Sequence, residues 1–127
     1  MTLVEKATTA NLSAATTPLL AGELTKIAEG VRRSAVEVRG HRSGGGSGVI
    51  WRADGLVVTN AHVIRGRETE VVLADGRTFA AAVVKRDDVS DLAALILEGR
   101  AGTEARDLPT ATIGDSDNLR VGEVVLA

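Results

Sequence analysis

One histidine and one aspartate stand where nucleophilic catalysis would need them. His62 ends the segment Gly-Leu-Val-Val-Thr-Asn-Ala-His, whose hydrophobic run is typical of a short strand. Asp91 opens a second hydrophobic run, Asp-Leu-Ala-Ala-Leu-Ile-Leu, 29 positions later. A histidine can take a proton from a nucleophile, and an aspartate bound to its ring fixes the tautomer and stabilises the imidazolium. The two residues therefore predict a general base and its orienting partner.

Each of these residues also has a plainer interpretation. A lone histidine at a strand end is most often structural or exposed. A catalytic role for His62 therefore requires a carboxylate partner. Asp87 and Asp88 compete with Asp91 for that role. We favour Asp91 because it adjoins the apolar residues that follow it, which should make its carboxylate the most buried of the three and in need of a partner. We expect His41, in a glycine-rich loop, to be exposed to solvent.

A nucleophile does not follow this pair. The expected third member is a serine in a turn such as Gly-x-Ser-Gly-Gly, and the sequence to Ala127 contains none. Ser47 lies among glycines, but the strand pattern Val-Ile-Trp follows it rather than the helix of a hydrolase elbow or of a phosphate-binding loop. The chain has no cysteine, which excludes disulfides and a thiol nucleophile, and two histidines alone make a poor metal site. We therefore expect no metal and no cofactor.

Charge and hydropathy limit the partners. The net charge is −2, which gives no electrostatic reason to expect nucleic acid. A local cluster of arginines (Arg32, Arg33, Arg39 and Arg42) is interrupted by Glu37 and is best read as a solvated face. No apolar run is long enough to span a membrane. The N-terminus lacks the pattern of a secretory signal, so the protein is not exported or its signal is not in this sequence.

The positioning elements follow from the hydrophobic period. We expect a flexible arm over residues 1–16, an amphipathic helix over 17–33 and an all-β domain over 34–127. Thr17 and Pro18 suit the start of the helix, and its apolar stripe should dock on a body elsewhere. Asp-Gly pairs at Asp54 and Asp75 predict hairpins. We expect a first short strand to begin at residue 35, and further strands over 47–52, 56–59, 70–73, 78–85, 91–97 and 121–127. Between them we expect a loop over 41–46 and a polar loop over 98–109.

These residues also resemble a known family. The segments Gly46 to Ile64, Val71 to Phe79, Asp88 to Leu97 and Leu108 to Ala127 resemble, in order and spacing, trypsin-like serine proteases of the HtrA/Deg type. The resemblance covers roughly Ser34 to Ala127. It implies an antiparallel six-stranded barrel, the N-terminal half of a two-barrel fold whose active site lies between the barrels.

The resemblance also implies roles and partners. His62 would be the general base and Asp91 its orienting partner, while the nucleophilic serine and the oxyanion hole would belong to a second, C-terminal barrel. The implied function is proteolysis of unfolded or damaged proteins, in a periplasmic or other extracytoplasmic compartment. We expect the chain to end before the second barrel and to be inactive alone. The alternative is a non-catalytic interaction module that binds another protein or forms a homo-oligomer through its exposed face.

Overall fold

The computed structural model describes residues 16–40, 44–66, 68–99 and 105–126. The chain divides into two units, residues 1–30 and 31–127, and each is considered by itself. The expected flexible arm lies almost entirely outside the described residues, as does His41. Of the helices described, none is both long enough and apolar enough to cross a membrane.

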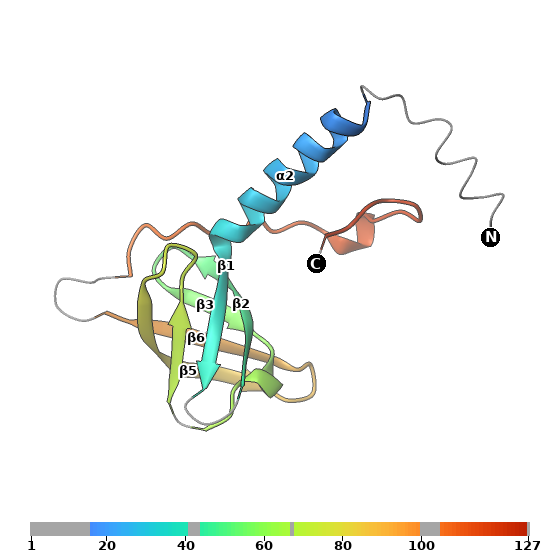
Figure 1. Ribbon diagram of the computed structural model, residues 1–127. Helices are drawn as coiled ribbons and strands as arrows, with labels where there is room; N and C mark the ends of the chain where they lie inside the picture. The colour runs from blue at the N-terminus through green and yellow to red at the C-terminus, as the bar shows by residue number, and fades with distance from the viewer. Residues whose placement is uncertain (1–15, 41–43, 67, 100–104, 127) are drawn as a thin grey trace. The chain divides into compact units, whose positions relative to one another are not determined.

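Helix α2 covers Thr16–Ser34, close to the expected range (Figure 1). Arg32 and Arg33 lie in its last turn, where cations complement the partial negative charge of the helix C-terminus. The Ser34 hydroxyl donates to the carbonyl of Val31, at 3.0 Å, and so satisfies one of the final carbonyls. The expectation that the apolar stripe of this helix docks on another body stays a prediction.

Six antiparallel strands form a closed barrel, as the family resemblance implied (Figure 1). Their order around the barrel is β1-β2-β3-β6-β5-β4, and β4 pairs again with β1. Closure leaves no sheet edge unpaired. The strands are β1 Ala35–Gly40, β2 Gly45–Arg52, β3 Leu56–Thr59, β4 Thr69–Val72, β5 Thr78–Asp87 and β6 Leu92–Glu98.

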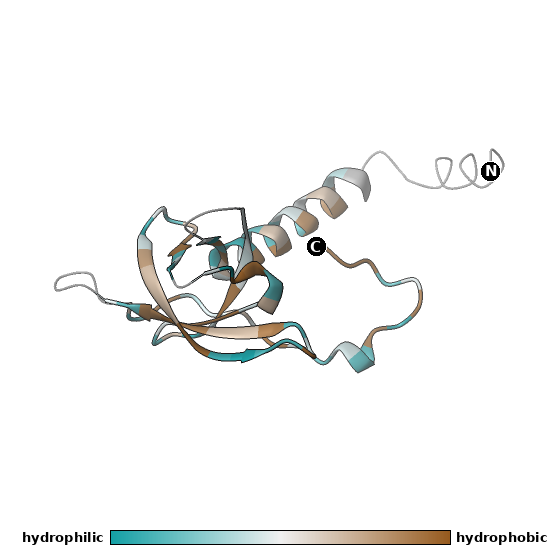
Figure 2. Ribbon diagram, turned by 90° about the horizontal axis from the view of Figure 1, so that it is seen from below, coloured by the Kyte–Doolittle hydropathy of each residue, from teal (hydrophilic) through white to brown (hydrophobic). Residues whose placement is uncertain are grey.

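Alternation of buried and exposed residues builds the core. Along β6, Ala93, Leu95 and Leu97 are buried and the residues between them are more exposed. This period of two places alternate side chains inside the barrel. In Figure 2 long stretches of the barrel strands carry the apolar colour, as do parts of the helix and the end of the chain. The core is almost wholly aliphatic, with a single aromatic: Val36, Val38, Ile50, Val57, Ile64, Val71, Leu73, Phe79, Ala81, Ala93, Leu95, Leu97 and Leu108.

Both predicted hairpins are present. Gly55 (φ +101°) closes the β2–β3 turn, and its amide donates to the carbonyl of Arg52 at 3.1 Å. Gly76 (φ +88°) does the same for the β4–β5 turn, donating to the carbonyl of Leu73 at 2.9 Å. Positive φ is accessible to glycine at little cost, which is why the Asp-Gly pairs predicted these turns correctly.

Two sequence expectations are wrong. Gly45 and Gly46 belong to β2, not to a loop, and pair with Arg39 and Val38. A Cβ on Gly45 would lie only 2.5 Å from the carbonyl oxygen of Val38, so the missing side chain permits this pairing. The segment expected as a polar loop has no helix or strand over residues 105–109, and it also contributes Leu108 to the core, where its amide donates to the carbonyl of Ala53 at 3.3 Å.

The second wrong expectation is the final strand. Residues 121–126 form no strand, although their composition favours one. The barrel is already closed by the β1–β4 pairing and offers this segment no edge. Its apolar side chains are exposed, and Figure 2 shows the end of the chain in the apolar colour.

Candidate active site

His62 lies in a short turn at the end of β3. Thr59, the last residue of β3, is anchored by its hydroxyl, which donates to the carbonyl of Ser47 on β2 at 2.7 Å. The chain then enters the single 3₁₀ turn η1, Ala61–Val63, in which Ala61 is buried. This burial fixes the turn against the barrel while the next side chain, that of His62, projects outward.

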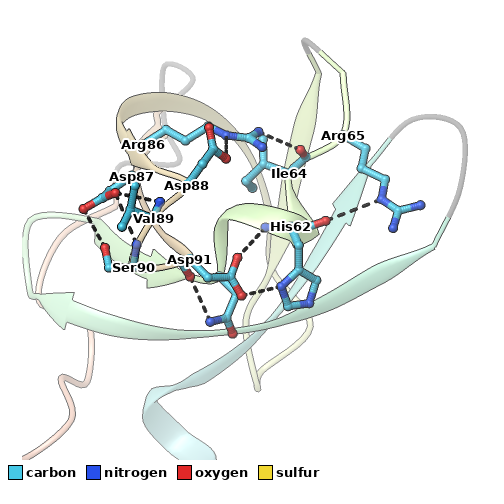
Figure 3. Close-up of polar contacts among 10 residues, drawn as sticks. His62, Ile64, Arg65, Arg86, Asp87, Asp88, Val89, Ser90 and Asp91 are labelled. Atoms are coloured by element: carbon cyan, nitrogen blue, oxygen red, sulfur yellow. Dashed lines mark hydrogen bonds and ion pairs between the residues drawn. The ribbon is translucent and has the colours of Figure 1, made fainter.

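The structure brings His62 and Asp91 into direct contact (Figure 3). The imidazole Nδ1 lies 2.6 Å from Asp91 Oδ2, and the backbone amide of His62 donates to Asp91 Oδ1 at 2.9 Å. One carboxylate therefore binds both the main chain and the ring of the same residue. An ionised carboxylate can only accept, so the proton of this contact is on Nδ1, and in a neutral imidazole the lone pair is then on Nε2.

The backbone of Asp91 is unusual and is held in place. Its φ is +53°, a left-handed conformation that aspartate and asparagine tolerate better than other non-glycine residues. Its carbonyl accepts from the amide of Ala61 at 3.1 Å and from the Asn60 side chain at 3.0 Å. These bonds tie the residue before β6 to the turn that follows β3. Sequence reasoning missed Asn60, although it immediately precedes the turn.

Hydrogen bonds hold the pKa of Asp91 below its ordinary value. The main cause is the backbone amide of His62, followed by the His62 side chain. Both stabilise the charged form of the carboxyl group. Asp91 is therefore ionised at neutral pH, as an orienting partner of an imidazole must be.

The pair lies at the open rim of the barrel rather than inside it. Of the side-chain surface of His62, 67% is exposed, and of Asp91 43%. Asp91 is the least exposed of the three neighbouring aspartates, as expected, since Asp88 is 72% exposed and Asp87 is also exposed. The carboxylate is thus held by its hydrogen bonds and only partly by burial.

Three further hydrogen bonds support the segment that carries Asp91. Asp87 accepts from the Ser90 hydroxyl at 2.6 Å and from the amides of Val89 and Ser90, which folds residues 87–90 into a compact turn. The Ser90 hydroxyl is the main reason that the pKa of Asp87 is lowered. The spacing Asp-x-x-Ser is a signal from which this turn could have been predicted.

Arg86 joins the two halves of the site. From β5, its Nη1 donates to the carbonyl of Ile64 at 3.0 Å and its Nε donates to Asp88 at 2.8 Å (Figure 3). Ile64 is two residues after His62, and Asp88 is three residues before Asp91. No sequence signal pointed to Arg86, because the contact depends on how β5 is placed beside the turn.

The arrangement can accept a proton and hold the resulting charge. Nε2 of His62 is the free basic atom, and the carboxylate on the other side of the ring stabilises an imidazolium. Within the ranges that the structure describes, no three carboxylate or histidine side chains gather as a metal site would require. The His62–Asp91 pair itself has the geometry for proton transfer.

The chain is similar in sequence to known peptidases. The model of the trypsin-like peptidase domain matches residues 46–127, a span that contains both His62 and Asp91. The chain belongs to the trypsin-like peptidase family. Its sequence is 43% identical over 83 residues to the human protein "Serine protease HTRA4", covering 65% of this chain and 16% of that protein.

Other relatives have similar names. Identity is 46% over 90 residues to a "Probable periplasmic serine endoprotease DegP-like" of Marinomonas sp., covering 70% of this chain and 18% of that protein. It is 41% over 86 residues to "Serine protease Do-like HtrA" of Lactobacillus helveticus, covering 65% and 20%. The chain spans only 16–21% of the length of such relatives.

Proposed function

We propose that this chain supplies the general-base half of a serine endopeptidase active site. In this proposal His62 Nε2 takes the proton of a serine hydroxyl as it attacks a peptide carbonyl, and later returns it to the leaving amine. Asp91 holds the ring and stabilises its charge. The observation that carries the proposal is the 2.6 Å contact between Nδ1 and Oδ2 at an open rim, in a chain of this family.

The proposal places the nucleophile on a second barrel. Within the printed sequence, no Gly-x-Ser-Gly-Gly turn is present. The rim that carries His62 and the exposed apolar side chains of residues 121–126 are the surfaces that such a barrel would cover. The polypeptide substrate and its unfolded state rest on the names of the relatives and on analogy within the family.

A pair without a nucleophile should not hydrolyse peptides. No alkoxide forms without the serine, and losing even one oxyanion donor costs about 3–4 kcal/mol of transition-state stabilisation. We therefore expect the purified 127 residues to leave unfolded casein intact. Casein cleavage by this chain alone, retained after contaminating proteases have been removed, would contradict the proposal that the nucleophile lies on a second barrel.

The positive test joins the chain to a second barrel. Residues 1–127 are fused at Ala127 to the serine-bearing barrel of the Lactobacillus helveticus relative, and casein cleavage is measured. We expect the fusion to cleave casein and the variant His62→Ala of the fusion to be inactive. The isolated chain cannot provide this comparison, because it is expected to be inactive with or without the substitution. A folded fusion that retains activity after this substitution would contradict the proposal and favour the alternative of a non-catalytic interaction module.

A further inference from the structure

A recess of about 320 Å³ opens directly beside His62. This volume is at the low end of the range for ligand sites, and it suits one side chain of a polypeptide better than a whole cofactor. The start of β2, the residue before η1, η1 itself and the turn after it form its walls. The described residues that line it are Gly44, Gly45, Gly46, Ser47, Asn60, His62, Val63 and Arg65.

One wall of the recess consists of bare backbone. A Cβ on Gly46 would lie 2.5 Å from Val63 Cγ2, and one on Gly45 would lie 2.5 Å from the carbonyl oxygen of Val38. Gly44 has a φ of +71°, which disfavours other residues. Packing and backbone conformation therefore keep this wall free of side chains, so that the recess stays open and its peptide groups can be reached.

Of the charged side chains that the structure describes around the recess, Arg65 is the one without a carboxylate partner in contact with it. Among the described lining residues, Arg65 and His62 are the side chains that can carry charge, and any positive charge on His62 is balanced by Asp91 at 2.6 Å. Arg65 is exposed, and its Nε donates to the carbonyl of His62 at 3.4 Å. That long contact uses one of five guanidinium donors and places the guanidinium near His62.

We propose that this recess takes an acidic side chain of the polypeptide substrate, next to the bond at which His62 acts, and that Arg65 selects it. The proposal rests on the proteolytic function above and adds a substrate class to it. A guanidinium matches a carboxylate in charge and in the spacing of its donors, which a neutral amide does not. Asn60 and Ser47 provide further polar groups on the walls.

The test compares two neutral-ended peptides that differ in one group. The ¹⁵N-labelled 127-residue chain is titrated with acetyl-Ala-Ala-Glu-Ala-Ala-amide and with its Gln counterpart, and amide shifts are followed by NMR. We expect the Glu peptide to shift Gly45, Gly46 and Arg65 and to bind about two- to fivefold more tightly than the Gln peptide, as for an exposed ion pair. The preference should fall in about 1 M salt.

Matched variants assign the preference to one residue. Arg65→Gln should make the two peptides equal, whereas Arg52→Gln, at the far end of β2, should leave the preference intact. Equal binding of both peptides to the unchanged chain, or shifts absent from the recess, would overturn the proposal. A preference that survives Arg65→Gln would do the same. Because the readout is binding and not turnover, these outcomes leave the proton-transfer role of His62 to the casein test.

Discussion

At the scale of single residues, the site depends on one carboxylate that accepts from two groups of His62. In Asp91→Asn the single amide oxygen can keep one of these bonds, and asparagine still tolerates the positive φ. If the oxygen keeps the backbone amide, the new NH₂ faces Nδ1 and forces the ring proton to Nε2. We expect the imidazole tautomer to change, as measured by ¹⁵N NMR of the ring.

The tautomer change should also appear in turnover. In the fused enzyme proposed above, Asp91→Asn should lower kcat by about 10⁴-fold, because Nε2 can no longer accept the serine proton. Asp88→Asn is the matched control, since Asp88 contacts Arg86 and not His62. A ring that keeps its proton on Nδ1 in Asp91→Asn would show that the carboxylate does not set the tautomer.

A substitution can separate the two main causes of the lowered pKa of Asp91, which are the backbone amide and the side chain of His62. In His62→Ala the ring is lost but the backbone amide, the larger cause of the lowered pKa, remains. We expect the pKa of Asp91 to rise only part of the way to its ordinary value of about 3.9. The measurement is a ¹³C NMR titration of the Asp91 carboxyl group, and a full return to the ordinary value would contradict this order of causes.

The sign of the pH effect follows from the same shift. A carboxyl group whose pKa is lowered by folding stabilises the fold above its unfolded pKa and loses that contribution as pH falls through its folded pKa. The link between Asp91 and His62 should therefore be complete above about pH 4 and weaken below it.

At the scale of elements, Arg86 connects the turn after β3 to the turn before β6. Arg86→Gln should loosen both turns without unfolding the barrel, because its partners lie at the rim. We expect the Ile64 amide, which donates to Ala61 at 3.1 Å, to exchange about two- to fivefold faster with solvent. Arg77→Gln is the control: Arg77 is 42% exposed, against 41% for Arg86, and it pairs within its own hairpin. Equal effects would show that Arg86 is not a specific link.

The elements also show which features a sequence can predict. Hairpins at Asp54 and Asp75 and the strand period are local, so they were predicted correctly. His62 and Asp91 were predicted to meet because each lies at a strand end and the family resemblance paired them. Arg86 could not be predicted, since its contact with Ile64 spans 22 positions and depends on strand placement. For the same reason, the final segment could be recognised as strand-like but not as lacking a partner.

At the scale of the whole barrel, stability and the site share strand β6. Asp91 precedes this strand, Leu92 begins it, and Leu95 stands at its centre. Leu95 pairs with Val57 on β3 and with Val83 on β5, so it is held between two neighbours of a closed sheet. Its side chain is fully buried, whereas Leu92 is 47% exposed. The same strand thus offers a buried and an exposed leucine for one substitution.

Leu95→Ala should destabilise the barrel by about 2–5 kcal/mol, because it removes buried apolar surface and leaves a cavity among rigid strands. Leu92→Ala should cost less than about 1 kcal/mol, since its side chain already contacts water. The free energy of unfolding of the full chain is measured by urea titration with circular dichroism. Equal losses would show that the interior of this nearly aliphatic barrel is not closely packed around Leu95, and a site positioned by β6 would then lack the rigid support that its 2.6 Å contact requires.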